Sequence, residues 1–342
     1  DQLAIDRLLI ELDGTEDKSR LGGNATVATS MAVAHAAATT AGQPLWRYFG
    51  GLGPRTMPLP EIQIFGGGAH AARRVDVQDF MVIAVGANDY VQALDWTAEV
   101  YRAAGQIMDA AGLLQGVADE GGYWPVFETN EAALGALVKA IEKAGLTPGD
   151  EVAISLDVAA SEFGEDGKYR LGLEGRDLDS DGLGELLQGW IERYPIVSIE
   201  DPLAEDDKAG LIEFTRAIGD RVQIVGDDYL ATNADRVTRA ADAGACNAVL
   251  IKPNQAGTLS EAYAAVEAAT AAGWGAVVSA RSGETEDVTI VHLAVGWGAG
   301  QLKVGSFARS ERMAKWNEGL RIAEALDNGG ALPSRSAFPW RR

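Results

Sequence analysis

The chain has 342 residues, of which 47% are hydrophobic and 23% are charged, a composition typical of a globular protein with a large core. Its formal net charge of −21 argues against nucleic acid and anionic membranes as partners, because both attract surplus lysine and arginine. The lone cysteine, Cys246, excludes an internal disulfide, and no apolar run approaches the roughly 20 residues that span a bilayer. We therefore expect a soluble, cytoplasmic protein that binds anionic ligands through a local cationic pocket or a metal.

Residues 1–56 predict a small N-terminal domain of helices, with an alanine-rich helix at 25–41 that ends at Gly42. Proline and glycine then punctuate residues 54–60 as they do in linkers, so we place a domain boundary at Met57. Residues 57–342 form a second domain of a length that single (β/α)8 barrels reach.

Short apolar runs alternate with helical patterns through this second domain. Eight runs predict strands, at residues 61–65, 79–83, 152–157, 196–201, 222–227, 248–252, 276–279 and 301–305. Helical spacing of apolar residues occurs at 90–111, 130–145, 182–194, 208–218, 233–243 and 259–272, and Thr129 or Asn130 fits the N-cap of the second of these. The alternation predicts a parallel sheet, with two consecutive helices after the first two strands as a departure from strict order.

Charged side chains end five of these apolar runs. Three runs end in the carboxylates of Asp157, Glu200 and Asp227, and two end in the lysines Lys252 and Lys303. Because every strand of a parallel barrel points the same way, we expect these side chains to meet at one mouth. Three oxygen ligands for a hard cation would then face two ammonium groups, an arrangement that suits removal of a proton beside a carboxylate.

Nine motifs resemble enolase, the phosphopyruvate hydratase of glycolysis, in collinear order along the chain. They are ELDGTEDKS (11–19), GGAH (67–70), DEGG (119–122), LDVAASEF (156–163), SIEDPLAEDD (198–207), VGDDYLATN (225–233), IKPNQAGTL (251–259), RSGETED (281–287) and ARSERMAKWN (308–317). The resemblance implies an α/β fold, an enolase-type TIM barrel of ββαα(βα)6 connectivity behind a partial N-terminal α+β capping domain. It also implies a homodimer or a larger homo-oligomer.

The resemblance implies a lyase that removes the proton alpha to the carboxylate of 2-phosphoglycerate and forms phosphoenolpyruvate. Asp157, Glu200 and Asp227 match the ligands of Mg²⁺, and Lys303 and Lys252 match the catalytic base and its neighbouring lysine, both in contact with substrate. Enolase-superfamily sites are an established example of a lysine or histidine base working with one or two Mg²⁺ ions. We expect the second ammonium and the metal to lower the pKa of the base.

The resemblance assigns five further residues to the substrate. Arg281 and Ser282 match the phosphate-binding arginine and serine, and Glu120 matches the acid that protonates the departing hydroxide. His70 matches a histidine on a mobile loop that folds over the substrate. Asp79 matches a catalytic, substrate-binding glutamate at the pole of the site that handles the C3 hydroxyl.

Two departures from the family pattern fall at that pole. Asp79 is shorter than the family glutamate by one C–C bond, roughly 1.5 Å, and Ala280 replaces a histidine. A displacement near 1 Å costs on the order of 10²-fold in rate, so the leaving-group machinery is predicted to be weakened or rebuilt. The space beside Ala280 is open to Tyr123, to Trp124 or to a bulkier substrate.

Three functions therefore stay open. The first is an enolase acting on 2-phosphoglycerate or a close phosphorylated or phosphonylated analogue, and the second is a specialised paralogue similar to the carboxyphosphonoenolpyruvate synthases of phosphonate biosynthesis. The third is a non-catalytic binding protein on the same scaffold. In the family a capping-domain loop supplies a serine to a second metal; its motif is not found in this sequence, so one or two Mg²⁺ ions remain open.

Overall fold

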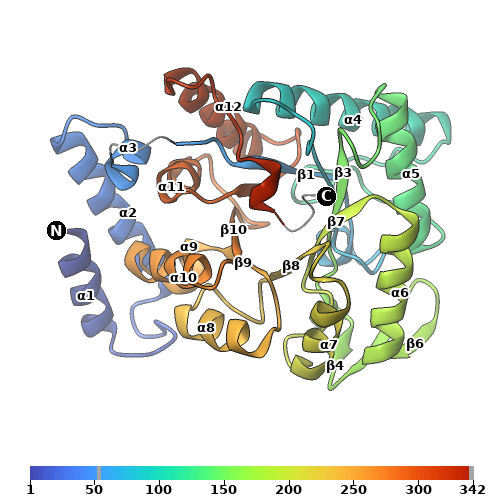
Figure 1. The fold of residues 1–342 in the computed structure, drawn as a ribbon, viewed down its shortest axis with the longest axis horizontal. Helices are drawn as coiled ribbons and strands as arrows, with labels where there is room; N and C mark the ends of the chain where they lie inside the picture. The colour runs from blue at the N-terminus through green and yellow to red at the C-terminus, as the bar shows by residue number, and fades with distance from the viewer. Residues whose placement is uncertain (52–54, 339–342) are drawn as a thin grey trace.

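The structure is a computed structural model that describes residues 1–51 and 55–338. Three helices form its N-terminal part: α1 (Gln2–Asp13), α2 (Gly23–Thr40) and α3 (Leu45–Gly50). They lie beside α10 (Leu259–Ala271) and α11 (Thr289–Trp297), as Figure 1 shows. An ion pair between Lys18 and Glu261 at 2.8 Å anchors this unit to α10, and so does the hydrogen bond that the Leu259 amide donates to Ser30 at 3.0 Å.

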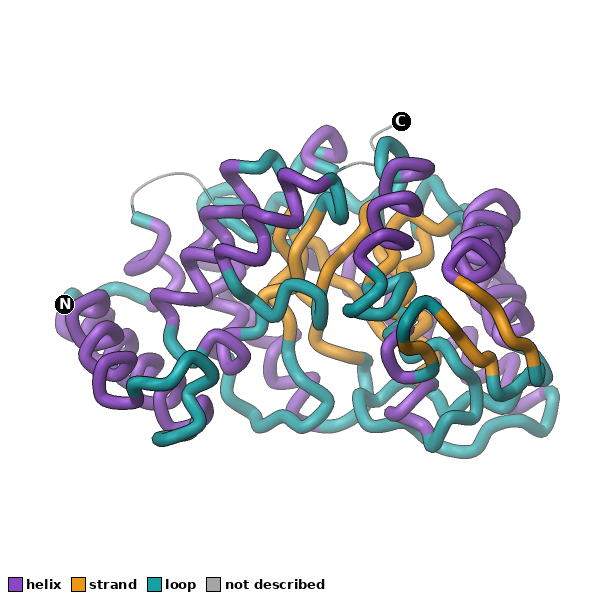
Figure 2. Tube along the Cα trace, turned by 90° about the horizontal axis from the view of Figure 1, so that it is seen from below, coloured by secondary structure: helices purple, strands orange, loops and turns teal. Residues whose placement is uncertain are grey.

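Eight strands close into a barrel within the described residues, in the spatial order β1-β11-β10-β9-β8-β7-β3-β2. Their bounds are β1 (Leu59–Gly66), β2 (Asp79–Ile83), β3 (Ala153–Asp157), β7 (Ile196–Glu200), β8 (Gln223–Gly226), β9 (Ala248–Ile251), β10 (Gly275–Ser279) and β11 (Gln301–Gly305). All eight predicted strands are present, with ends that differ by at most two residues. Figure 2 shows the barrel strands enclosed by helices.

One strand runs against the others. β2 pairs antiparallel with both β1 and β3, whereas the pairs from β3 round to β1 through β7 and β11 are parallel. The expectation that every strand points the same way is therefore wrong for β2. The reversal places Asp79, the first residue of β2, opposite Asp157, the last residue of β3.

Helices cover the outside of the barrel. Two consecutive helices, α4 (Tyr90–Ala110) and α5 (Asn130–Lys143), pack on each other as predicted, and Thr129 caps α5 by accepting from the Ala132 amide at 3.1 Å. The remaining helices are α6 (Ser180–Arg193), α7 (Lys208–Ile218), α8 (Ala234–Ala243), α9 (Pro253–Ala256), α10, α11 and α12 (Ser310–Ala325), with short 3-10 turns at Gly68–Ala71, Ala160–Glu162 and Arg335–Ala337. Among the described residues, no helix is long and apolar enough to cross a membrane.

A small antiparallel sheet outside the barrel was not predicted. It consists of β4 (Gly164–Glu165), β5 (Lys168–Leu171) and β6 (Arg176–Asp179), joined by close turns between β3 and α6. Its strands have two to four residues and many charged side chains, so they carry no long apolar run.

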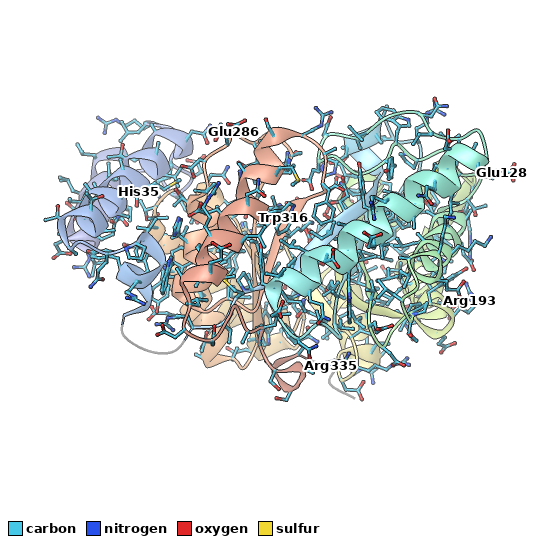
Figure 3. All side chains as sticks on the ribbon, turned by 90° about the horizontal axis from the view of Figure 1, so that it is seen from above. His35, Glu128, Arg193, Glu286, Trp316 and Arg335 are labelled. Carbon is cyan, nitrogen blue, oxygen red and sulfur yellow. The ribbon has the colours of Figure 1, made fainter. Side chains whose placement is uncertain are left out.

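Strand residues alternate between the helix-covered face and the barrel interior. On β1, Ile62 and Ile64 belong to the main hydrophobic core, while Glu61 and Gln63 are buried on the other face. The opposite end of the chain also packs on the barrel: the Trp316 indole of α12 donates to the Ser306 carbonyl at 3.1 Å, and Arg335 donates to the Val85 carbonyl at 2.7 Å (Figure 3). The barrel interior therefore contains polar side chains, and helices and loops pack around the strands that carry them.

Candidate active site

A cavity of about 340 Å³ opens where the parallel strands end. Most of the predicted site residues line it: His70, Glu120, Asp157, Asp227, Lys252, Arg281, Ser282 and Lys303. Asp79 and Glu200 lie behind the wall, fully or almost fully buried, and reach the site through His70 and Lys303. The structure thus brings all ten residues into one neighbourhood.

Lys303 lies within β11 rather than at its end, because the strand continues to Gly305. Its Nζ donates to Asp157 Oδ2 and to Glu200 Oε2, each at 2.7 Å, and lies 3.7 Å from Asp79 Oδ2. Burial alone lowers the pKa of Lys303, but Asp157 and Glu200 outweigh burial and raise this pKa well above its usual value. With these partners Lys303 is an ammonium, and the expected lowering of its pKa, which depends on a bound metal, stays a prediction.

Lys252 directly follows β9 and pairs with a different carboxylate. Its Nζ donates to Asp227 Oδ2, and Gln255 donates to the other oxygen of Asp227 at 3.3 Å. Burial lowers the pKa of Lys252, but Asp227 raises it above its usual value. Lys252 is thus held by a carboxylate from the neighbouring strand, whereas Lys303 of β11 is held by carboxylates of β3 and β7, which do not pair with β11 in the barrel; both lysines line the cavity.

The acidic residues at the strand ends have the chemistry of a cation site. Oxygen-only ligands suit Mg²⁺, and Glu200 Oε1 is buried without a hydrogen-bond partner among the described residues. A buried carboxylate oxygen without a hydrogen-bond partner is uncommon in proteins, and a bound metal ion would satisfy it. The carboxylates of Asp157 and Glu200 hold the Lys303 ammonium through Asp157 Oδ2 and Glu200 Oε2, so a cation bound here would share these two carboxylates with that ammonium.

The groups of ligand atoms that converge most closely differ from the predicted trio. In residues 1–51 and 55–338, Asp201, Asp227 and Asp228 bring one oxygen each within 4.8 Å of one another, as do the ligand atoms of His70, Asp79 and Glu120. The predicted trio is not such a group. The sequence analysis missed Asp201, although the motifs SIEDP and VGDD each contain a second acidic residue directly after a predicted metal ligand.

Backbone geometry aims Asp201 into the site. Its φ of 40° is left-handed, and its two carboxylate oxygens accept from the amides of Asp227 at 2.8 Å and Asp228 at 2.9 Å. Burial and the Asp227 charge raise the pKa of Asp201 well above its usual value. This carboxyl therefore braces the loop that presents Asp227.

A second pole of the cavity is built from His70, Asp79 and Glu120. His70 Nδ1 lies 3.1 Å from Asp79 Oδ1, and its Nε2 lies 4.0 Å from Glu120 Oε1. Burial lowers the pKa of His70, but the Asp79 carboxylate outweighs burial and raises this pKa to about 9. Burial and Asp79 also raise the pKa of Glu120, so this carboxyl is able to act as a proton donor.

Gln63 was also missed by the sequence analysis. Its amide donates to Asp79 Oδ1, and its carbonyl accepts from the Gly122 amide at 2.8 Å. It therefore links the shortened Asp79 to the DEGG segment that carries Glu120. The sequence contains a signal for Gln63, because it is a polar residue within the apolar run of β1.

The third pole is cationic and lies on the loop after β10. Arg281 Nη1 donates to Asn254 at 3.0 Å. The fully buried Arg312 holds this loop from below, because it donates to the carbonyls of Arg281 and Ser282, each at 2.7 Å. Arg312 lies in the motif ARSERMAKWN and was not singled out. Arg312 thus holds the backbone of this loop, while the Arg281 side chain lines the cavity.

Two family models account for the chain. The model described as the enolase C-terminal TIM barrel domain matches residues 54–338, and the model described as the enolase N-terminal domain matches residues 1–49. The chain belongs to the enolase family. The resemblance and the barrel fold are therefore confirmed, and the boundary predicted at Met57 stays a prediction.

Within this enolase-family frame, the space beside Ala280 is part of the cavity. Ala280 lines the wall and is 5% exposed. Tyr123 does not fill the space: it stacks on Tyr101 with ring centroids 4.4 Å apart, and its hydroxyl occupies the position that a side chain at Gly105 would need. Trp124 is not among the described residues that line the cavity. Neither aromatic side chain therefore fills this space, and a bulkier substrate stays a prediction.

The enolase barrel also holds a buried acid beneath the site. Glu61 of β1 lies in register with Lys303 and forms a hydrogen bond with the Ser155 hydroxyl of β3. Burial raises the pKa of Glu61 above its usual value. The sequence analysis did not select Glu61, although a glutamate in a strand of otherwise apolar residues indicates an inward-facing polar group.

Proposed function

We propose that this chain is a Mg²⁺-dependent lyase that removes the proton alpha to a carboxylate of 2-phosphoglycerate or a close phosphorylated or phosphonylated analogue. Its product is of the phosphoenolpyruvate type. The observation that carries the proposal is Lys303 on the floor of a cavity of about 340 Å³, between Asp157 and Glu200, with Arg281 in the wall. This arrangement pairs a proton-transfer group with an anion-binding group.

In the proposed mechanism, Asp157, Glu200 and Asp227 would hold the metal, which would supply positive charge next to the substrate carboxylate. Lys303 Nζ would take the proton from carbon as a neutral amine, after it has left its two carboxylates and given its extra proton to solvent; the positive charges of the metal and of Lys252 would favour this neutral form. Lys252 binds the substrate carboxylate.

The other two poles act on the rest of the substrate. Arg281 and Ser282 bind the phosphoryl or phosphonyl group. Glu120 protonates the leaving group, and its raised pKa supports this role because a protonated carboxyl is required. His70 and Asp79 form an ion pair that closes this pole over the substrate.

A pathway-specific function similar to carboxyphosphonoenolpyruvate synthase is the second candidate. Ala280 and Asp79 favour it, because the enolising groups are present while the pole that handles the leaving group has a shorter acid and an open wall. We also propose, from the family, a homodimer or larger homo-oligomer, which light scattering after size exclusion measures.

The test is to incubate the protein with 2-phosphoglycerate and Mg²⁺ in D2O and to follow C2 deuteration by NMR and phosphoenolpyruvate by ultraviolet absorbance. Rapid elimination supports a hydratase and opposes the second candidate. Exchange without elimination supports a rebuilt leaving-group pole. If the protein shows neither exchange nor Mg²⁺-dependent binding, the non-catalytic alternative is supported. Lys303→Met is the control, and it should lose both C2 deuteration and phosphoenolpyruvate formation.

A further inference from the structure

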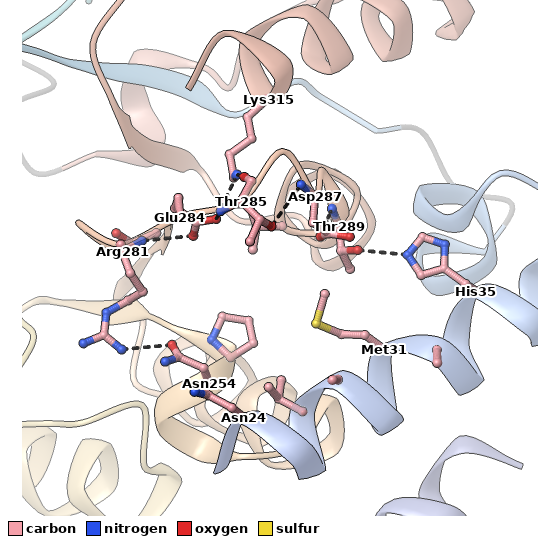
Figure 4. A pocket seen from close by; sticks show the side chains of 17 residues that line it. Asn24, Met31, His35, Asn254, Arg281, Glu284, Thr285, Asp287, Thr289 and Lys315 are labelled. Carbon is pink, nitrogen blue, oxygen red and sulfur yellow. Dashed lines mark hydrogen bonds and ion pairs between the residues drawn. The ribbon is translucent and has the colours of Figure 1, made fainter. Parts of the chain in front are cut away.

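A second, larger cavity adjoins the proposed active site. It has a volume of about 530 Å³ and lies between α2 and the loop formed by residues 281–289 (Figure 4). Ser279 and Arg281 line both cavities, so the two meet at the arginine. Its volume falls within the roughly 300–1,000 Å³ that small-molecule sites occupy.

The wall formed by α2 is apolar between two polar residues, Asn24 and His35, that also line the cavity. Val27, Ala28, Met31 and Ala32 face the cavity from this helix, and Ile290 of α11 completes the apolar lining. Their spacing of three and four residues places them on one side of α2. A ligand part that packs here gains from removal of apolar surface from water.

Lys315, Glu284 and His35, which also line the cavity, have partners within the protein. Lys315 forms an ion pair with Glu284 at 2.9 Å and donates to the Thr285 carbonyl at 2.8 Å, and His35 forms a hydrogen bond with Thr289 at 2.9 Å, as Figure 4 shows. These contacts neutralise Lys315 and Glu284, whereas the Asp287 carboxylate accepts from the Thr289 amide at 2.9 Å and has no ion-pair partner among the described residues. They also tie α2 and α12 to the loop and keep the cavity open.

Arg281 is different, because it stands at the junction of the cavities with donors to spare. Among the described residues, its guanidinium donates one hydrogen bond, to Asn254 at 3.0 Å, and pairs with no carboxylate. A guanidinium offers five N–H donors and binds phosphate or phosphonate oxygens in pairs. An anion bound by Arg281 would therefore border both cavities.

We propose that the cavity beside α2 is a subsite for an apolar substituent on the phosphorus of the bound substrate. Tetrahedral phosphorus has four positions: one joins the carbon skeleton in the active-site cavity, two oxygens meet Arg281, and the fourth is directed to the second cavity. The ligand class is a substituted phosphonate or a phosphate diester with an apolar group. This inference rests on the proposed function, which assigns the anion to Arg281.

Calorimetric titration with methylphosphonate and phenylphosphonate, both in Mg²⁺ buffer, tests the subsite. We expect the wild-type protein to bind phenylphosphonate about tenfold more tightly than methylphosphonate, because the ring buries apolar surface on α2. Ala28→Trp fills the cavity and should abolish most of this preference while leaving the Kd of methylphosphonate unchanged. Ala36→Trp, exposed on the same helix and outside the lining, is the matched control and should behave as wild type.

Ala32→Trp is a second filling variant at another exposed position, and thermal unfolding verifies that each variant folds. Equal Kd values for the two phosphonates on the wild type, or an unchanged preference in both filling variants, overturn the subsite. Methylphosphonate that binds in an Arg281-dependent manner without a phenyl preference overturns the subsite alone. Methylphosphonate that does not bind, or that binds equally to Arg281→Ala, overturns the assigned anion site of the proposed function and the subsite with it.

Discussion

Replacing Lys303 with methionine tests whether one set of carboxylates serves both the lysine and the cation. Methionine has a similar length and removes the ammonium, so Asp157, Glu200 and Asp79 are left facing one another in a buried site. At an effective dielectric constant of about 20, opposite charges 2.7 Å apart attract by roughly 6 kcal/mol before desolvation is subtracted. Removal of one partner from a buried pair costs about 3–5 kcal/mol in measured cases.

We therefore expect Lys303→Met to lower the free energy of unfolding by about 3–5 kcal/mol in EDTA. Addition of Mg²⁺ should restore more stability to the variant than to the wild type, because the cation no longer competes with the ammonium. Urea denaturation followed by circular dichroism, with and without Mg²⁺, measures both quantities. Deuteration of 2-phosphoglycerate at C2 should fall by about 10²–10⁴-fold.

Lys208→Met, at an exposed position on α7, is the matched control and should change the free energy of unfolding by less than about 0.5 kcal/mol. A loss below about 1 kcal/mol for Lys303→Met in EDTA would refute the view that these pairs are strongly coupled. An equal Mg²⁺ increment for variant and wild type would refute shared carboxylates.

Three further predictions concern single side chains. Because burial raises the pKa of Glu61, its ionisation costs stability as pH rises above the usual carboxyl range; Glu61→Gln should raise Tm by about 2–4 °C more at pH 8 than at pH 4, and the exposed Glu324→Gln should show no such difference. The His70–Asp79 pair should contribute fully below about pH 6.5 and be lost as pH rises through about 9, so urea titrations of the wild type should show a decline in the free energy of unfolding on the order of 2 kcal/mol over this range. His70→Gln should remove this decline; a decline of the same size in the variant contradicts the prediction. Arg281→Lys should weaken inorganic phosphate binding by about tenfold in calorimetry, because lysine cannot bind two oxygens in parallel, and an unchanged Kd rules that grip out.

The barrel strands were predictable because buried parallel strands leave continuous apolar runs that end in polar residues. The direction of β2 was not predicted, although its run, DFMVI, carries its one charged residue at the start rather than at the end. Pairing with both β1 and β3 decides that direction, and it places Asp79 at the mouth. The small sheet of β4, β5 and β6 was missed because strands of two to four residues give too short a period to recognise.

The candidate site was predictable as a set of residues, because the motifs carry them in order, but not as a set of interactions. The sequence does not reveal that Lys303 pairs with Asp157 and Glu200 while Lys252 pairs with Asp227. Gln63 and Arg312 were overlooked because their roles depend on groups at least 16 residues away.

The sequence by itself determined the family, the barrel and the identities of the groups at its mouth, since local apolar periodicity and long motifs encode these directly. Only the tertiary structure decided which charges meet, and with them the sign of each pKa shift. The pKa of Lys303 rises rather than falls because two carboxylates within 2.7 Å outweigh burial. Coulomb energy and desolvation depend on distance and burial, and neither quantity is a property of residue order.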